Sequence, residues 1–461
     1  MAGPEPRPDR VSPAERVLIA PLRNFLHTEA AGGVVLVAAT AVALVWANSP
    51  WQDSYVTLWH TQLSISVGNR SIDLDLREWV NEGLMAIFFL VVGLEIKREL
   101  VEGELREPRR AALPAIAALG GMLVPAVIYL AVNAGGRGSH GWGIPMATDI
   151  AMAVGVVSLL GRRVSASLKL FLLALAIADD IGAIVVIAVF YTDGVSVRAL
   201  EVALVLVAAV AVMRKVGVVA IPAYVVVGAA LWLALYESGV HATLTGVVLG
   251  LMAPTQPIRQ RQLIDETALT DLSTVEAARE TAVLARESVS VVEWLEHLLH
   301  PWSSFLIVPL FALANAGVPL SSSALSDAAR SPITYGVVLG LVLGKLIGIA
   351  GFTWLATRSG IGMLPEGATW QGLLGVAALG GIGFTVSIFV AGLAFDDPVL
   401  QNDAKIGILI ASVVAATLGS LILLGRRPGG TDGRGGDRQS SIGRRPVETG
   451  GHQGESRHGV A

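Results

Sequence analysis

Cysteine is absent from the 461 residues of this chain, and charged residues make up only 15% of it. Without cysteine the chain has neither a disulfide framework nor a thiolate metal site. The formal net charge of −4 is too small to indicate nucleic acid or another polyanion as a partner. No G-x-x-x-x-G-K-[S/T] phosphate-binding motif occurs, so we expect no nucleotide-driven step and no cofactor.

Apolar residues dominate instead, at 53% of the chain with a mean hydropathy of +0.64. This composition lies outside the range of soluble globular proteins and predicts an all-α polytopic membrane protein. The hydropathy pattern predicts about twelve transmembrane helices, near residues 30–47, 81–101, 112–133, 144–160, 168–191, 198–213, 217–236, 240–253, 303–319, 333–357, 371–394 and 404–425.

The polar segments outside these spans divide the chain. Residues 1–28, rich in proline and charge, are expected to be a cytoplasmic tail, and the membrane domain covers residues 29–425. It includes an amphipathic, mostly acidic cytoplasmic loop at 254–300. Residues 426–461 are glycine-rich and polar, which predicts a disordered tail. Lys and Arg are concentrated in alternate loops, and this asymmetry places both termini in the cytoplasm.

The first extracytoplasmic loop contains "LSISVGNRSIDLDL". Apolar and polar residues alternate on both sides of a Gly-Asn turn, which predicts a β-hairpin over residues 63–74. An isolated two-stranded hairpin is marginally stable in water, so we expect it to lean on the membrane domain or on a second copy of itself. An irregular loop is the alternative interpretation.

Four charged residues, Asp149, Asp179, Asp180 and Lys345, lie inside expected spans with apolar sequence on both sides, as candidates for charges at membrane depth. A charge at mid-bilayer costs roughly 2.5–3.5 kcal/mol on insertion scales, which a packing role seldom justifies. Successive residues of a helix point about 100° apart, so Asp179 and Asp180 cannot both face one small ligand equally. One can coordinate while the other relays or pairs. Carboxylates suit hard cations and protons, so the set predicts a cation or proton site.

Two spans carry residues that weaken helices, in "WGIPMATDIA" and "ALGGIGFTVSI". Breaks at membrane depth are tolerated where the freed backbone groups line a cavity, and paired broken helices indicate an ion site. At such a crossing Asp149 would compensate positive helix ends and Lys345 negative ones. Glycine and proline are also common in ordinary membrane helices, so neither stretch is decisive alone.

Over residues 15–425 the chain resembles the NhaA-type sodium/proton antiporters. The resemblance rests on "GLEIKREL", "ATDIA", "LALAIADDIGAI", "SGVHATLTGV", "EHLLHPW", "PLFALANAGV", "GKLIGI" and "GIGFTVSIF", in the order of the family. It implies an electrogenic exchanger in a prokaryotic cell membrane that expels Na⁺ or Li⁺ and admits protons. It also implies inverted repeats with two discontinuous crossing helices, and a homodimer formed through the 63–74 hairpin.

The resemblance also assigns roles to residues. Asp179 and Asp180 resemble the pair that binds Na⁺ and carries protons, with Thr148 and Asp149 beside them, and Lys345 resembles the lysine that pairs with a core aspartate. The pH-sensing residues of the family match Glu95, Glu99, Glu296, His297 and His300, for which an ordinary solvated cluster is the alternative. The 254–300 loop is longer than the family predicts.

Two other classes of function stay open. An intramembrane aspartyl protease also needs two buried carboxylates that share a proton, and Asp149 and Asp180 could face each other across two helices. That class gives no role to Lys345 or to the broken helices. An ion channel or a scaffold is disfavoured, because a dense carboxylate pair binds cations too tightly for fast conduction.

Overall fold

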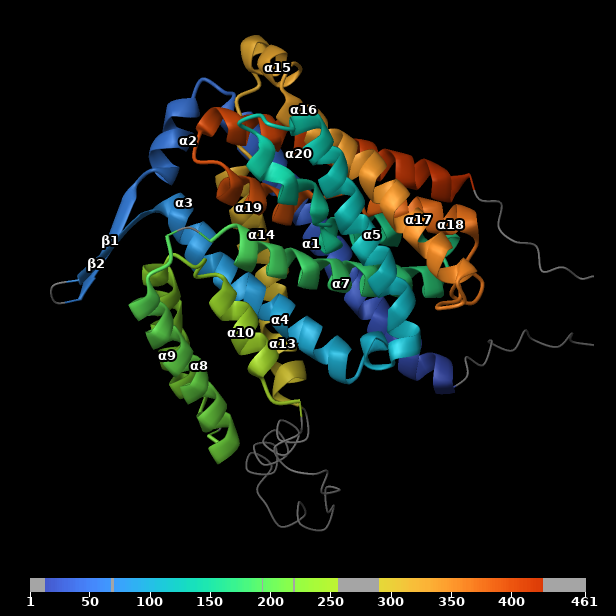
Figure 1. Cartoon of the computed structure of the whole chain (residues 1–461), viewed down its shortest axis with the longest axis horizontal. Coiled ribbons are helices and arrows are strands. Elements are labelled where there is room, and N and C mark those ends of the chain that lie inside the picture. The colour runs from blue at the N-terminus through green and yellow to red at the C-terminus, as the bar shows by residue number, and fades with distance from the viewer. Residues whose placement is uncertain (1–12, 68–69, 193, 219, 256–289, 426–461) are drawn as a thin grey trace, which may run out of the picture. The chain divides into compact units, whose positions relative to one another are not determined.

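The computed structural model of the chain describes residues 13–67, 70–192, 194–218, 220–255 and 290–425. Within these ranges the chain is mostly helical, with one two-stranded sheet (Figure 1). Residues 1–12 of the expected N-terminal tail, 256–289 of the expected loop and the whole expected tail 426–461 lie outside the described residues.

The N-terminal half contains the hairpin and most of the long helices. Its elements are α1 (Pro13–Ala47), α2 (Gln52–Trp59), β1 (Gln62–Val67), β2 (Arg70–Asp75), α3 (Leu76–Glu78), α4 (Met85–Val101), α5 (Pro108–Asn133), α6 (Ile150–Leu159), α7 (Ala166–Phe190), α8 (Val197–Val216), α9 (Ile221–Ser238) and α10 (Leu244–Met252). Short 3₁₀ segments lie at Glu104–Arg106, Ser139–Met146 and Gly161–Arg163.

The C-terminal half contains the second broken span. Its elements are α13 (Val291–Trp302), α14 (Val308–Asn315), α15 (Ser322–Ala328), α16 (Pro332–Leu339), α17 (Lys345–Arg358), α18 (Trp370–Leu379), α19 (Phe384–Ala394) and α20 (Pro398–Leu424). In the chain as a whole, π-helical turns join three pairs of helices. They lie at Trp79–Leu84 between α3 and α4, at Ser303–Ile307 between α13 and α14, and at Gly340–Gly344 between α16 and α17. Such turns shift the helix register locally and are common at functional sites.

Each range with a predicted span contains helix in the structure. In the described part of the chain, eight helices are long and apolar enough to cross a membrane, or nine if the bent pair α18–α19 is one span. The chain is therefore a multi-pass membrane protein. The number of twelve and the arrangement into inverted repeats stay predictions.

Two helices begin earlier than the sequence pattern predicts. Helix α1 begins at Pro13, within the expected tail 1–28. Helix α13 begins at Val291, within the expected loop 254–300, and forms a candidate span that ends at Asn315. The cause at α13 is local, because the Ser290 hydroxyl accepts a hydrogen bond from the Glu293 amide at 3.1 Å and caps the helix. The last turns of the expected loop are therefore part of a helix.

The expected hairpin is present. Strands β1 and β2 pair antiparallel, with Leu63 opposite Leu74 and Ile65 opposite Ile72. Trp79 at the start of the next helical segment donates a hydrogen bond to the Leu63 carbonyl at 2.8 Å. The hairpin thus rests on the helical domain at its base. Leu63 and Ile65 on β1 are each 48% exposed, so apolar side chains on one face of the hairpin remain uncovered in the single chain.

Helices α5 and α17 pack closely because small residues face each other. A β-carbon on Gly348 would lie 2.1 Å from the Gly120 carbonyl oxygen, and one on Gly344 would lie 2.7 Å from the Pro125 α-carbon. Side chains at these glycines would force the helices apart. The close contact holds the start of α17, where Lys345 is the first residue, inside the helix bundle.

Candidate functional site

The first broken span is interrupted between the 3₁₀ segment Ser139–Met146 and helix α6. Residues 147–149 are extended there, and Asp149 is the N-cap of α6, with its Oδ1 atom accepting a hydrogen bond from the Met152 amide at 3.0 Å. A carboxylate at this position satisfies an amide that the helix itself cannot. The "PMATD" sequence thus determines where the 3₁₀ segment stops and the α-helix starts.

The second broken span is interrupted between α18 and α19, which are bent by 44° to each other. Glycines make the break possible through close approach. A β-carbon on Gly381 would lie 2.3 Å from the Leu341 carbonyl oxygen, and one on Gly383 would lie 2.4 Å from the Ser387 hydroxyl oxygen. The "GGIG" sequence therefore lets irregular backbone pass through the packed interior.

Hydrogen bonds join the two breaks. The Asp149 amide donates to the Ile382 carbonyl at 2.6 Å, and the Thr148 hydroxyl donates to the Gly380 carbonyl at 2.8 Å. The Asp149 Oδ2 atom accepts from the Thr385 amide at 2.9 Å and also from the Thr385 hydroxyl. One carboxylate therefore caps the N-termini of both α6 and α19, as its expected role of compensating positive helix ends requires.

Lys345 and Asp179 form a buried ion pair. The Lys345 Nζ atom donates to Asp179 Oδ2 at 2.6 Å and to the Thr148 hydroxyl at 3.0 Å, and the exposed fractions of Lys345 and Asp179 are 0% and 2%. The sequence also predicts that Lys345 compensates negative helix ends. In the structure its contact with the C-terminal end of α18 is indirect, because Lys345 donates to the Thr148 hydroxyl and that hydroxyl donates to the Gly380 carbonyl. Its charge is neutralised by the carboxylate instead.

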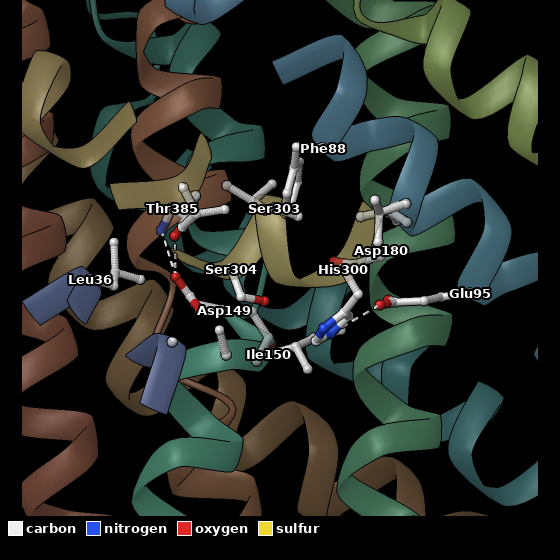
Figure 2. Close-up of a pocket in the computed structure, with 17 residues that line it drawn as sticks. Leu36, Phe88, Glu95, Asp149, Ile150, Asp180, His300, Ser303, Ser304 and Thr385 are labelled. Carbon is white, nitrogen blue, oxygen red and sulfur yellow. Dashed lines mark hydrogen bonds and ion pairs between the residues drawn. The ribbon is translucent and has the colours of Figure 1, made fainter. Parts of the chain in front are cut away.

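Asp180 takes no part in that ion pair, in keeping with the helical rotation between adjacent residues. It lines a pocket of about 70 Å³, large enough for a few water molecules (Figure 2). Among the residues that the structure describes, none forms an ion pair with Asp180, which is 7% exposed. The polar residues that share the pocket are Glu95, Thr148, Asp149, His300, Ser303, Ser304 and Thr385.

Glu95 and His300 lie at one side of this pocket, and Figure 2 shows them pointing toward each other. His300 Nε2 lies 3.9 Å from Glu95 Oε1. The neighbouring Arg98 pairs with the buried Glu296 and lies 3.9 Å from a Glu99 oxygen. Four of the five expected pH-sensing residues are therefore close together, whereas His297 is exposed and does not line the pocket.

The sequence reasoning missed several contributors to this region. Arg98 was not singled out, although it follows Glu95 by three residues and so lies on the same face of α4. Thr385 and Ser303 were also not assigned. Thr385 directly follows the glycine-rich break, a position that could have identified it, but no local pattern marks Ser303 as a pocket residue.

Comparison with known proteins identifies the family of the chain. Residues 23–423 match the family model described as Na⁺/H⁺ antiporter 1. The chain is 48% identical to the Na⁺/H⁺ antiporter NhaA of Rhodopirellula baltica over 91% of this chain and 96% of the relative. It is 47% identical to Na⁺/H⁺ antiporter NhaA 3 of Frankia alni, over 91% and 93% respectively. The chain therefore belongs to the NhaA family of Na⁺/H⁺ antiporters.

Proposed function

We propose that this protein exchanges Na⁺ for protons across the cell membrane, with Asp180 as the carboxylate that both ions reach. The observation that carries the proposal is the placement of Asp180 in a water-sized pocket beside the crossing of the two broken spans. Na⁺ is a hard cation that carboxylate, hydroxyl and carbonyl oxygens bind. A proton on Asp180 removes the charge that Na⁺ needs, so the two ions compete.

The neighbours of Asp180 have different roles in this proposal. Asp149 holds two helix ends in place, so we assign it to positioning and to the local negative field. Thr148 bonds Lys345 and the second break, and thereby connects the ion pair to the crossing. Asp179 completes the Na⁺ site when its bond to Lys345 loosens and the lysine releases its proton, and the lysine takes up a proton again when Na⁺ leaves.

Exchange requires the site to open to one side at a time. The two broken spans meet only through hydrogen bonds and close contacts, so one half of the chain can rock against the other around them. Inverted repeats and about twelve spans suit this motion. Uptake of more than one proton for each Na⁺ would make the exchange electrogenic, and it would use the proton gradient without any covalent step.

The geometry disfavours an aspartyl protease. A protease dyad needs two carboxyl groups that share one proton. Both Asp149 oxygens already accept hydrogen bonds from backbone amides at the starts of two helices, so the carboxylate is committed to those amides. Asp149 is therefore unsuited to be the partner of Asp180 in such a dyad.

The proposal is tested with purified protein in liposomes that contain a pH-sensitive dye. Addition of Na⁺ or Li⁺ outside should drive protons out of proton-loaded vesicles, whereas K⁺ should not. Electrogenic exchange should also slow when valinomycin and K⁺ are left out, because the charge moved then builds an opposing potential. Equal rates with Na⁺ and K⁺ would contradict the proposed selectivity.

We infer that the Arg98 cluster, which consists of Glu95, Arg98, Glu99, Glu296 and His300, senses pH. Within it His300 faces Glu95 at the side of the ion pocket, and unperturbed histidines titrate near pH 6.5. We expect His300→Gln to shift the pH dependence of exchange between about pH 6 and 8. His297→Gln is the matched control on the same helix, and its profile should follow the wild type. The opposite result, a shift only with His297→Gln, would refute the assignment.

We propose a homodimer that forms through the hairpin, because β1 exposes Leu63 and Ile65 and a two-stranded sheet leaves open edges. Deletion of residues 63–74 should give a monomer in mild detergent by light scattering, with exchange activity retained, since every proposed ion ligand lies in one chain. A deletion variant that stays dimeric would exclude this interface. A stable monomer without exchange would show that transport depends on it.

The proposal also places both termini in the cytoplasm, supported by the excess of Lys and Arg in alternate loops. It puts the hairpin outside and the Arg98 cluster near the cytoplasmic surface. Single cysteines can be introduced into this cysteine-free chain and labelled with a membrane-impermeant maleimide. A cysteine at Ser66 should react only from outside, and a cysteine at Ser440 should react only from inside. Reversed labelling would overturn the orientation.

A further inference from the structure

A second cavity, which shares no lining residue with the ion pocket, lies where α17 ends and α18 begins. These two helices are neighbours in Figure 1. It has a volume of about 430 Å³. Its lining combines one cation with aromatic and apolar side chains: Trp354, Thr357, Arg358, Gly362, Met363, Leu364 and Trp370. None of these residues has a role in the proposed exchange.

The cavity is built on a loop that hydrogen bonds hold in place. The Ile361 amide donates to the Ala356 carbonyl at 3.1 Å and closes the end of α17. The Ser167 hydroxyl of α7 donates to the Glu366 carbonyl at 2.7 Å, and the Thr369 hydroxyl accepts from the Gly372 amide at 3.1 Å to cap α18. A ligand therefore meets a preformed site.

Arg358 supplies the charge of the cavity. Its guanidinium carbon lies 5.7 Å from the centre of the Trp354 ring, a cation–π distance. Within the described part of the chain no carboxylate pairs with Arg358. Arg358 is also the last residue of the candidate span Pro332–Arg358, so it lies at the level where the hydrocarbon ends and headgroups begin.

Exposed apolar side chains lie on the loop that forms the cavity. Met363 is 89% exposed and Ile361 56%, on a loop that touches the ends of two helices. We propose that this cavity binds an anionic phospholipid, with the lipid phosphate at Arg358, the glycerol region against Trp354 and Trp370, and an acyl chain along Met363 and Ile361. An unpaired guanidinium selects a lipid with net negative charge, because a zwitterionic headgroup brings its own cation. A free phosphate would leave the apolar part of the cavity unfilled.

Native mass spectrometry of the detergent-purified protein, titrated with phosphatidylglycerol, phosphatidylcholine or glycerol phosphate, tests the proposal. We expect phosphatidylglycerol to bind more tightly than phosphatidylcholine, and Arg358→Ala to weaken phosphatidylglycerol binding about fivefold while phosphatidylcholine binding stays unchanged. Trp370→Ala should weaken both lipids. Arg330→Ala is the matched control, since Arg330 is exposed just before the opposite end of the same span.

Three results would overturn the proposal. Phosphatidylglycerol binding that is equal in wild type and Arg358→Ala would remove the assigned phosphate contact. Equal affinity of the wild type for phosphatidylglycerol and phosphatidylcholine would remove the selectivity. Glycerol phosphate that binds as tightly as phosphatidylglycerol would make the site one for a soluble anion. A folding defect is separated from lost binding by requiring an unchanged melting temperature, and by Arg358→Lys, which should keep part of the selectivity.

Discussion

Asp180→Asn is expected to abolish Na⁺-driven proton movement in liposomes, to the level of vesicles without protein. The amide keeps the size of the carboxyl group but has no charge for Na⁺ and takes up no proton in the physiological range. Because Asp180 faces the pocket and has no ion-pair partner among the described residues, the substitution should leave the protein folded. The melting temperature in detergent should therefore be unchanged or higher.

The matched control is Glu293→Gln, the same loss of a carboxylate at an exposed position on α13. It should retain wild-type exchange. A variant Asp180→Asn that still exchanges Na⁺ for protons at the wild-type rate would remove Asp180 from the site. Loss of activity together with loss of folding would instead show that Asp180 has a structural role that the geometry does not indicate.

Lys345→Ala is expected to destabilise the protein by about 3–5 kcal/mol, because it leaves the Asp179 carboxylate buried without its partner. The Asp179 Oδ1 atom already lacks a hydrogen-bond partner within the described residues, and the remaining partner of Asp179, Thr148, is uncharged and cannot replace the lysine. The change should appear as a lower melting temperature in detergent and as a loss of yield. It should be larger at pH 8 than at low pH, where protonation neutralises the aspartate.

A double variant separates charge from packing. Asp179→Asn with Lys345→Met removes both charges and nearly preserves volume, so most of the lost stability should return while exchange does not. If the double variant is as unstable as Lys345→Ala alone, the ion pair is not the source of the destabilisation. The close packing of Gly344 against Pro125 would then be the first alternative cause to test.

Local chemistry in the sequence was sufficient to predict much of the site. The glycine, proline and threonine residues around Asp149 and Thr385 indicated both breaks, because helix-weakening residues act within a few positions. The rotation between adjacent helical residues predicted that Asp179 and Asp180 point in different directions. The alternation around residues 63–74 likewise predicted the hairpin and its pairing.

Contacts between distant segments were less predictable. Nothing near Lys345 shows that it pairs with Asp179 rather than Asp180, because that choice depends on how α17 packs against α5 and how α5 packs against α7. The inclusion of His300 and exclusion of His297 from the pocket depends on the orientation of α13. The π-helical turn Gly340–Gly344, which sets the direction of Lys345, has no sequence pattern that distinguishes it from an ordinary helix.

The central claim is that Na⁺ and protons compete for Asp180, and proton release on Na⁺ binding measures it most directly. Purified protein in weakly buffered detergent, without any membrane gradient, is mixed with NaCl or with KCl while the pH is recorded. We predict that Na⁺ releases protons from the wild type, that K⁺ does not, and that Asp180→Asn releases fewer protons and binds Na⁺ more weakly. Tight Na⁺ binding to the wild type with no proton release would contradict the account.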